Sequence, residues 1–330
     1  EDIRVKKVIV ILLVIFLAVN AAIFGTMEER IKIEEKKPRV TLIAPFANEA
    51  YWGSMANGFT KAGNDLGIST KCVGFTKMEI EKQIQAIESA IYAKVDGIVT
   101  AGMGESDEVR ALLEKADEEG IRVVLVDSDM EDVPKLCYIG TDNYEAGKMA
   151  GNDIIEITEG KGNIAVIVSK MEAQNQKERL EGFQEAIAQY PELKIRKILE
   201  GNSDVRVLNE RISRMLEEEQ DLTAVFCAEG YGTTSIAQII KDAKGEYDDL
   251  KVVGFGVSEL KREDIESGIL YSTIYQNSYE MGYRAAEAIK DSLEDKSVLP
   301  VDYTEIKSIK KGNIDEMEIN KGRGAQWHIY

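Results

Sequence analysis

From Arg39 onward, short runs of β-branched and aliphatic residues alternate with stretches of helical periodicity. The segments EIEKQIQAIESAIYAK (79–94) and NERISRMLEEEQ (209–220) are clear examples of the helical kind. The runs predicted to be strands span 39–44, 69–75, 97–102, 122–128, 135–140, 163–169, 194–200, 224–230, 251–257 and 270–276. Nearly continuous apolar strands joined by helices are typical of parallel sheets covered on both faces. The pattern therefore predicts an α/β fold.

The alternation restarts after the segment TDNYEAGK, at 141–148. Because the predicted strands are too many for one sheet of a small domain, we expect two doubly wound domains of similar build. In open parallel sheets, ligands bind beyond the carboxyl ends of the strands. Two such domains that face each other would therefore form one ligand cleft.

Two adjacent aromatic residues follow the first predicted strand. The segment LIAPFANEAYWGSMANGF places Tyr51 and Trp52 where the loop passes into a helix, at the first carboxyl end. Both rings are predicted to project into the cleft, where their flat faces suit a sugar ring. The alternative that one or both pack in the domain core stays open, above all for Trp52.

The N-terminal region carries one long apolar run. Val8–Phe24 has 17 residues without a charge and follows Arg4, Lys6 and Lys7. Such a run can just span a bilayer as a helix, and the preceding positive charges predict a cytoplasmic start. We expect an uncleaved anchor with the rest of the chain outside the cytoplasm, and residues 1–37 then comprise anchor and spacer. Cleavage after Ala21, which would release the protein, is the alternative.

Composition narrows the possible functions. The chain has 330 residues, a formal net charge of −18 and a single histidine, His328, near its C-terminal end. The acidic balance argues against nucleic-acid binding. Without a clustered histidine, a CxxC motif or a phosphate-binding loop, we expect no catalytic residue, no metal site and no cofactor. The glycine-containing turn before Ser106 is predicted to end with Ser106 as a helix N-cap.

Several segments in order resemble one known family. They are NEAYWGSMANGF, VDGIVTAG, VVLVDSD, YIGTDNYEAGKMAG, KERLEGFQEAI, AVFCAEG, VVGFGVSE and STIYQNSYEMG. From about Pro38 to Ile314 the chain resembles the type I periplasmic binding proteins, especially those that bind ribose and galactose. The resemblance implies two lobes joined by a hinge, with 38–142 and 277–306 in the first lobe and 143–276 and 307–320 in the second. Residues 321–330 form a tail beyond the match.

The resemblance also implies ligand-binding residues. Tyr51 and Trp52 match the stacking aromatics, and Asp127 matches the acid after the fourth strand. Arg179 matches an arginine that binds ring hydroxyls, and Gln276 a glutamine at the hinge. A carboxylate can accept hydrogen bonds from vicinal hydroxyls, while a guanidinium donates to ring oxygen and hydroxyl. Asn175, four residues before Arg179 on one helical face, is expected either at the cleft rim or in surface capping.

Five positions depart from the ribose-type pattern. Glu49, Gly102 and Glu229 stand where Asn is usual, Ser128 replaces an Arg, and Gly256 replaces an Asp. These changes make the expected pocket more negative, which favours an amino sugar or a donor-rich polyol over an acidic sugar. If Glu49 instead faces solvent at the cleft mouth, this preference weakens.

The resulting hypothesis is a monomeric extracytoplasmic binding protein that captures a sugar, amino sugar or polyol and delivers it to an ABC permease. The alternative is a membrane-anchored sensor that signals to a histidine kinase or chemoreceptor. An enzyme on the same scaffold is a third hypothesis, and turnover of a ligand would reveal it.

Overall fold

The computed structural model describes residues 14–20, 37–47, 50–76, 79–102, 106–202, 204–256, 259–316 and 326–329. The chain forms two units, residues 1–37 and 38–330. In the first unit, residues 14–20 are helical, while the rest of the predicted anchor Val8–Phe24 lies outside the described residues. No helix among the described residues combines the length and apolar character needed to cross a bilayer.

The second unit contains two sheets. The first has the strand order β11-β5-β4-β3-β1-β2-β13 and the second β12-β10-β9-β8-β6-β7. The strands of the first sheet are β1 (Arg39–Ala44), β2 (Ser69–Gly74), β3 (Gly97–Ala101), β4 (Arg122–Val126), β5 (Cys137–Gly140), β11 (Val301–Tyr303) and β13 (Trp327–Ile329). Those of the second are β6 (Gly162–Val168), β7 (Leu193–Glu200), β8 (Leu222–Cys227), β9 (Lys251–Phe255), β10 (Ser272–Gln276) and β12 (Ile306–Lys310). Each sheet with its helices is called a lobe below, lobe 1 and lobe 2 respectively.

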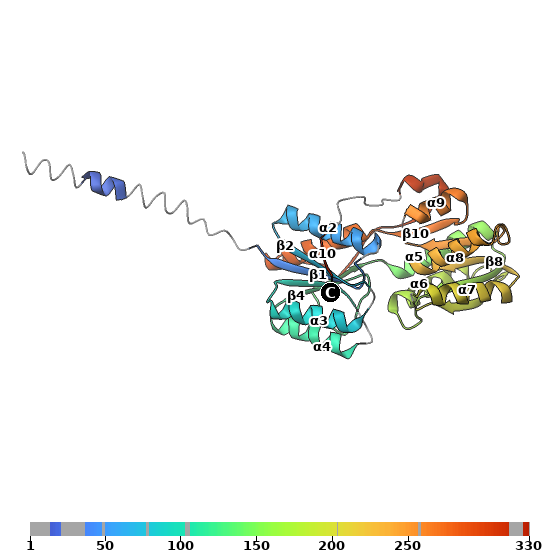
Figure 1. Ribbon diagram of the computed structural model, residues 1–330, viewed down its shortest axis with the longest axis horizontal. Helices are drawn as coiled ribbons and strands as arrows, with labels where there is room; N and C mark the ends of the chain where they lie inside the picture. Colours follow the sequence, from blue (N-terminus) through green and yellow to red (C-terminus); the bar gives the residue numbers. More distant parts are fainter. Residues whose placement is uncertain are drawn as a thin grey trace, which may run out of the picture. The chain divides into compact units, whose positions relative to one another are not determined.

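Helices cover both faces of each sheet (Figure 1). In lobe 1, α2 (Ala50–Leu66) and α10 (Ser278–Leu293) lie on one face, and α3 (Ile80–Tyr92) and α4 (Asp107–Glu118) on the other. In lobe 2, α5 (Asn143–Thr158) and α6 (Gln174–Ile187) lie on one face, and α7 (Val205–Glu218), α8 (Gly230–Asp242) and α9 (Glu259–Ser267) on the other. This arrangement explains why the strands are apolar almost throughout.

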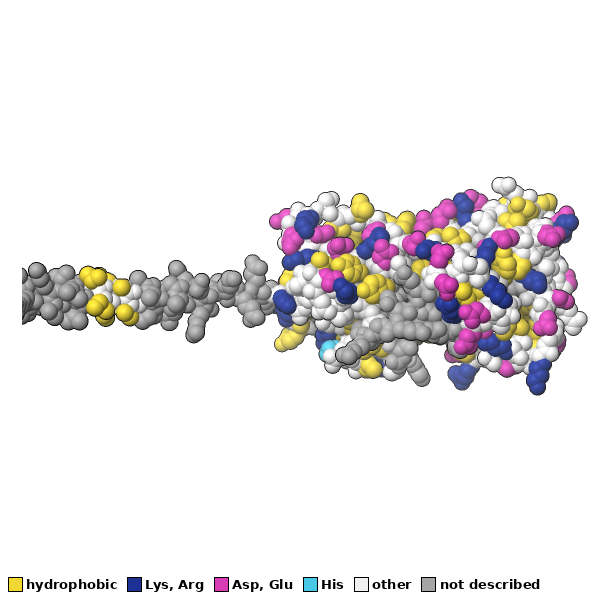
Figure 2. Space-filling model, turned by 90° about the horizontal axis from the view of Figure 1, so that it is seen from above, with side chains coloured by type: hydrophobic (Ala, Val, Ile, Leu, Met, Phe, Trp, Pro, Cys, Tyr) yellow, Lys and Arg dark blue, Asp and Glu magenta, His cyan; other side chains and the backbone are white. Residues whose placement is uncertain are grey.

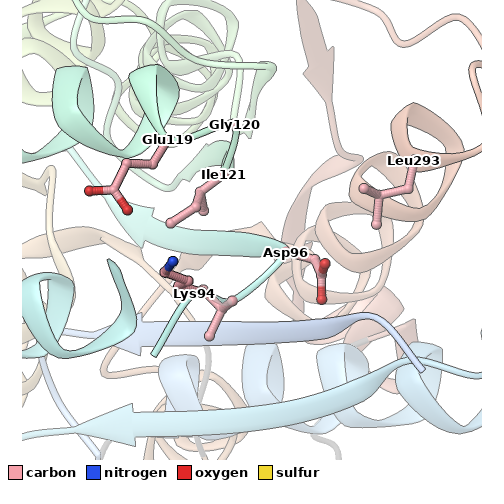
Figure 3. Close-up of a pocket in the computed structure, with 7 residues that line it drawn as sticks. Lys94, Asp96, Glu119, Gly120, Ile121 and Leu293 are labelled. Atoms are coloured by element: carbon pink, nitrogen blue, oxygen red, sulfur yellow. The ribbon is translucent and has the colours of Figure 1, made fainter. Parts of the chain in front are cut away.

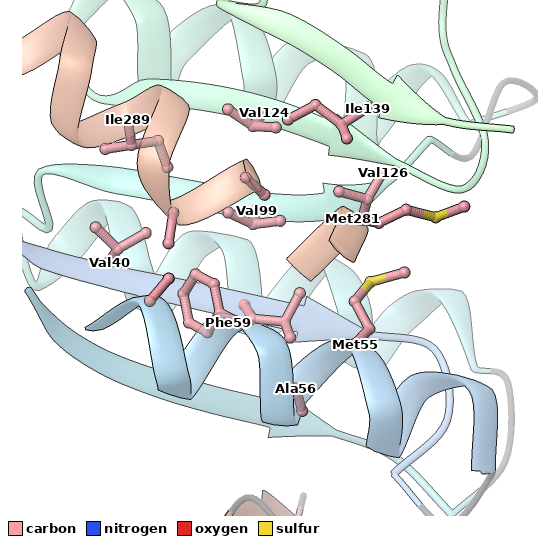
Figure 4. Close-up of a cluster of buried hydrophobic side chains, with 14 of the residues drawn as sticks. Val40, Met55, Ala56, Phe59, Val99, Val124, Val126, Ile139, Met281 and Ile289 are labelled. Carbon is pink, nitrogen blue, oxygen red and sulfur yellow. The ribbon is translucent and has the colours of Figure 1, made fainter. Parts of the chain in front are cut away.

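The core of lobe 1 shows how these layers meet. Phe59 and Met55 of α2 and Ile289 of α10 pack against Val99 of β3 and Val124 of β4, all fully buried (Figure 4). Each lobe thus has a hydrophobic core on both sides of its sheet, which fixes the strand ends that carry polar groups.

All ten predicted strands are present, within a few residues of their expected bounds. Three further strands were not predicted. β11 extends the first sheet beside β5, and β12 pairs antiparallel with β10 in the second. β13 of the C-terminal tail pairs in parallel with β2, so this part of the tail completes lobe 1. These strands are short or polar, and such sequences carry little periodic signal.

Acidic and basic side chains are interspersed over the face of the described surface seen in Figure 2. Many belong to ion pairs on the helices, such as Lys61–Asp65 and Arg214–Glu210. Ser106 caps α4 as predicted, because its hydroxyl accepts a hydrogen bond from the Val109 N–H at 3.2 Å. The three cysteines, Cys72, Cys137 and Cys227, are buried free thiols.

Candidate functional site

Asp127 anchors the lobe 1 half of the candidate site. It directly follows β4, where its carboxylate accepts hydrogen bonds from the hydroxyl of Tyr51 at 2.8 Å and that of Ser128 at 3.1 Å. Its backbone has a left-handed φ of 65°, which is costly for a residue with a side chain. The Tyr138 hydroxyl holds that backbone by donating to the Asp127 carbonyl oxygen at 2.9 Å. Two hydroxyl groups thus hold the carboxylate in one orientation, and a third holds its backbone.

Tyr51 is a donor to Asp127 over the whole usual pH range. Burial raises the pKa of its phenol well above the ordinary value, and the negative charge of Asp127 acts in the same direction. The hydroxyl also lies 3.4 Å from the sulfur of Met281. The predicted contribution of Tyr51 to the strand-end region therefore includes its hydroxyl as well as its ring.

Arg179 anchors the lobe 2 half. Its side chain, on α6, is 4% exposed. The guanidinium donates to Asn143 Oδ1 at 2.9 Å and to the Ala228 carbonyl oxygen at 2.8 Å, and its carbon lies 3.8 Å from the centre of the Phe255 ring. Burial lowers the pKa of Arg179, while the carboxylates of Asp127 and Glu229 act in the opposite direction. An arginine held this way stays charged and has a fixed orientation.

Contacts between the two lobes converge on the same region. Gln276, the last residue of β10, accepts hydrogen bonds from Arg179 at 3.2 Å and from Thr141 at 2.8 Å. Asn175 donates to the hydroxyl of Ser128 at 3.2 Å, so it lies between the lobes as one of the two expectations had it. The residues at the carboxyl ends of both sheets are thus close enough to bind one small ligand together.

Trp52 lies elsewhere. It is 4% exposed and belongs to the hydrophobic core of lobe 1, with its ring edge-on to Tyr51 at 5.5 Å between centroids. In this structure Trp52 packs against the ring of Tyr51 from within the core. Its contact with a ligand remains a prediction. Glu49 lies outside the described residues.

The structure explains why glycine stands at the two positions, 102 and 256, where the family pattern has a longer residue. A Cβ atom at Gly102 would come within 2.6 Å of the Ser128 carbonyl oxygen, to which the Gly102 N–H donates at 2.7 Å. Gly256 has a φ of 76°, which favours glycine. A Cβ there would lie 3.3 Å from the Lys261 ammonium nitrogen. At both strand ends, neighbouring groups occupy the space that a longer side chain would need.

Glu229 is 7% exposed and caps α8, where its carboxylate accepts a hydrogen bond from the Gly232 N–H at 3.2 Å. The helix N-terminus stabilises this negative charge. Groups of the protein therefore stabilise the negative charge of Glu229, and this charge does not require a cationic ligand.

Sequence reasoning missed three neighbours of the site. Phe46 follows β1 and Tyr231 is the second residue of α8. Their rings meet edge-on between the lobes, with 6.2 Å between the centroids. Both follow strand ends, so the rule that singled out Tyr51 could have found them. Lys261 on α9 lies in the charged segment ELKREDIES, which looks like a solvated helix and gives no such signal.

A surface hollow of about 660 Å³ lies at the other edge of the first sheet. Lys94, Asp96, Glu119, Ile121 and Leu293 line it, close to where β3 and β4 begin (Figure 3). Ligands of open parallel sheets bind at the carboxyl edge, so the hollow is not part of the candidate site. Within the described ranges, no cluster of three or more His, Cys, Asp or Glu side chains could hold a metal ion.

The arrangement is suited to binding a polyhydroxy molecule. It offers a carboxylate acceptor from lobe 1, a guanidinium donor from lobe 2 and an amide from Gln276, all held by protein hydrogen bonds. Such pre-oriented polar groups among apolar walls are typical of small-molecule sites.

A family model described as the periplasmic binding protein domain matches residues 40–297. The chain belongs to this family. It is 25% identical over 249 residues to the D-apiose import binding protein of Actinobacillus succinogenes, covering 74% of this chain and 79% of that protein. The resemblance to sugar-binding members that the sequence indicated is therefore confirmed.

Solved structures agree with this assignment. GanP, a glucose-galactose binding protein from Geobacillus stearothermophilus, superposes with a TM-score of 0.80 at 27% identity, covering 84% of this chain and 99% of GanP. A chain of the XylFII–LytSN complex superposes with a TM-score of 0.76 at 30% identity, covering 84% of this chain and 99% of that chain. The two-lobe α/β fold of the family is thus present in full.

Proposed function

We propose that this protein captures a sugar or sugar-like solute outside the cytoplasm and delivers it to an ABC importer. The observation that carries the proposal is the group formed by the half-buried Asp127 of lobe 1 and the buried Arg179 and Gln276 of lobe 2, near the carboxyl ends of the two sheets. Relatives named as sugar-import binding proteins support it, among them the D-apiose protein. Closure of two lobes on the solute would signal a loaded site to the importer.

In this proposal, each half of the site has its own task. Asp127 accepts hydrogen bonds from ligand hydroxyls, and Arg179 donates to a ring or hydroxyl oxygen. Tyr51 provides an aromatic wall, with Phe46 and Tyr231 beside it. Gln276 joins the ligand to the hinge, because it already bonds Thr141 at the crossover between the lobes.

We further propose that Val8–Phe24 anchors the protein in the membrane, with the binding unit outside the cytoplasm and monomeric. Support comes from the 17 uncharged residues after a basic cluster. Labelling with a membrane-impermeant reagent on whole cells, with and without the first 26 residues, tests this. The full chain is expected in the membrane fraction and labelled from outside, whereas the truncated chain, which lacks the segment that directs insertion, is expected in the cytoplasmic fraction and unlabelled.

Thermal unfolding of the full chain in mild detergent, with a panel of pentoses, hexoses, amino sugars and polyols, tests solute binding. A ligand that binds only the folded protein stabilises it by about 2.7 kcal/mol at a hundredfold excess over its Kd. A rise in Tm with one sugar or a few related sugars is expected. No rise with any member of the panel contradicts sugar binding.

A second candidate is a sensor that reports the solute to a membrane kinase. It is favoured by one observation, the 30% identity to a chain of the XylFII–LytSN complex. Affinity purification of the full chain from its own cells, with and without the identified sugar, separates the two. Recovery of a permease supports import, and recovery of a histidine kinase supports sensing.

A further inference from the structure

Lys261 is a buried lysine beside the candidate site. It is 6% exposed, and its ammonium donates to the Phe255 carbonyl oxygen at 2.9 Å. Phe255 ends β9, and its ring lies under the guanidinium of Arg179. Two cationic side chains, from α6 and α9, therefore approach the end of one strand.

The ammonium lies where the family resemblance places an acid. Ideal Cβ atoms at Gly256 and at Gly230 would each lie 3.3 Å from the Lys261 nitrogen. Gly256 also has a left-handed backbone that disfavours a longer side chain. The polar group at this strand end is thus a cation that reaches in from α9, in place of a carboxylate from the strand itself.

Lys261 changes the charge balance at this end of the sheet. Glu229 and Lys261 act on the same buried thiol, because the carboxylate raises the pKa of Cys227 and the ammonium lowers it. Among the described site residues, the cations Arg179 and Lys261 balance the carboxylates Asp127 and Glu229. Burying an uncompensated charge is costly, so a balanced site favours an uncharged ligand.

We propose that Lys261 is a specificity-determining residue that offsets Glu229 and restricts the site to neutral sugars, excluding amino sugars. An ammonium can only donate hydrogen bonds, so the ligand group that faces it must be an acceptor such as a hydroxyl or ring oxygen. A protonated amine there would meet a like charge. This inference rests on the proposed sugar-binding function and reverses the preference expected from Glu49 and Glu229 in the sequence.

The test compares matched ligand pairs in the full chain by calorimetry near pH 6, where sugar amines are protonated. The probes are D-glucose with D-glucosamine, D-galactose with D-galactosamine, and D-glucuronate. The native protein is expected to bind a neutral member at least tenfold more tightly than its amino partner. Lys261→Met should reduce this ratio at least tenfold, and Lys194→Met, at an exposed lysine near the start of β7, should leave it unchanged.

Two further variants keep the test decisive if Lys261→Met does not fold. Glu229→Gln leaves the ammonium uncompensated and should raise binding of D-glucuronate relative to D-glucose at least tenfold. The double variant removes both charges and should restore preference for the neutral sugar. The inference is wrong if the native protein prefers an amino sugar, or if the folded charge variants keep the native ratios. If no sugar binds the native protein, the proposed function fails as well, so the two failures are distinguishable.

Discussion

The two halves of the candidate site hold the Asp127 carboxylate in lobe 1 and the cations Arg179 and Lys261 in lobe 2 by different means. In lobe 1, hydroxyl groups of Tyr51 and Ser128 surround the carboxylate of Asp127. In lobe 2, strand-end carbonyl oxygens hold the cations, with Ala228 bound to Arg179 and Phe255 bound to Lys261. A carboxyl strand end presents carbonyl oxygens, so it can hold a cation directly. An anion there needs N–H or O–H donors, which are side-chain hydroxyls at Asp127 and the N–H of the following helix at Glu229. Lobe 2 therefore has the simpler construction and lobe 1 the more strained one.

Among the variants that test this difference between the lobes, the replacement of Arg179 should have the largest effect, a loss of affinity for the neutral sugar. Arg179→Met removes the charge-assisted donors that the proposal assigns to the ligand, and a hydrogen bond to a charged group contributes about 1.5–3 kcal/mol. We expect affinity for the neutral sugar to fall at least ~100-fold, since each 1.4 kcal/mol is about tenfold. Calorimetry measures it, with Arg206→Met, an exposed arginine of the same lobe, as control. A fall of less than about threefold would show that lobe 2 contributes little.

The variant Gly256→Asp places the family's acid back at position 256. It tests whether the strain of a left-handed backbone outweighs the attraction between that acid and Lys261. Gly256→Asp should lower the free energy of unfolding by about 1–2 kcal/mol, because a side chain at φ 76° is strained. Asn tolerates this region better, so Gly256→Asn should cost less. Urea unfolding measures both, with Gly312→Asp, where nothing crowds the added Cβ, as control. An unchanged or higher stability of Gly256→Asp would mean that attraction to Lys261 outweighs the strain.

The lobe 1 network can be broken at Tyr51. Tyr51→Phe removes one hydrogen bond to Asp127 and keeps the ring, so we expect a loss of about 1–2 kcal/mol in unfolding free energy and a weaker affinity for the sugar. Tyr283→Phe removes a comparable bond to Asp65 at an exposed site and should change stability by less than about 0.5 kcal/mol. Equal effects of the two variants would show that the Asp127 network has no special role.

The smallest expected effect concerns the contact between the lobes. Asn175→Ala removes the hydrogen bond to Ser128, worth about 0.5–1.5 kcal/mol. Without sugar, the lobes should separate more often, which raises the radius of gyration in small-angle X-ray scattering. Saturating sugar should abolish the difference. The control is Gln174→Ala, at the residue that precedes Asn175 on α6 and donates a hydrogen bond to Glu178. A variant that scatters like the native protein with and without sugar would exclude a closing role for Asn175.

The fold was largely predictable because its signal is local. Continuous apolar strands such as β1 and β9 follow from their own residues, and both faces of the sheets are buried as that pattern requires. β12 and β13 were missed because their pairing depends on distant strands and leaves little trace in their own sequences. Asp127, Arg179 and Gln276 could be selected because they lie at strand ends or match a family motif.

The sequence by itself determined the α/β alternation and the family, because hydrophobic periodicity and motif order are properties of the chain. Only the tertiary structure decided the polarity of the site. It placed Trp52 in the core, filled the space beside Gly102 with the 128–129 loop, and brought Lys261 from α9 to the end of β9. The electrostatic balance of a buried site depends on distances between residues far apart in the chain. That balance exists only once the strands and helices have packed.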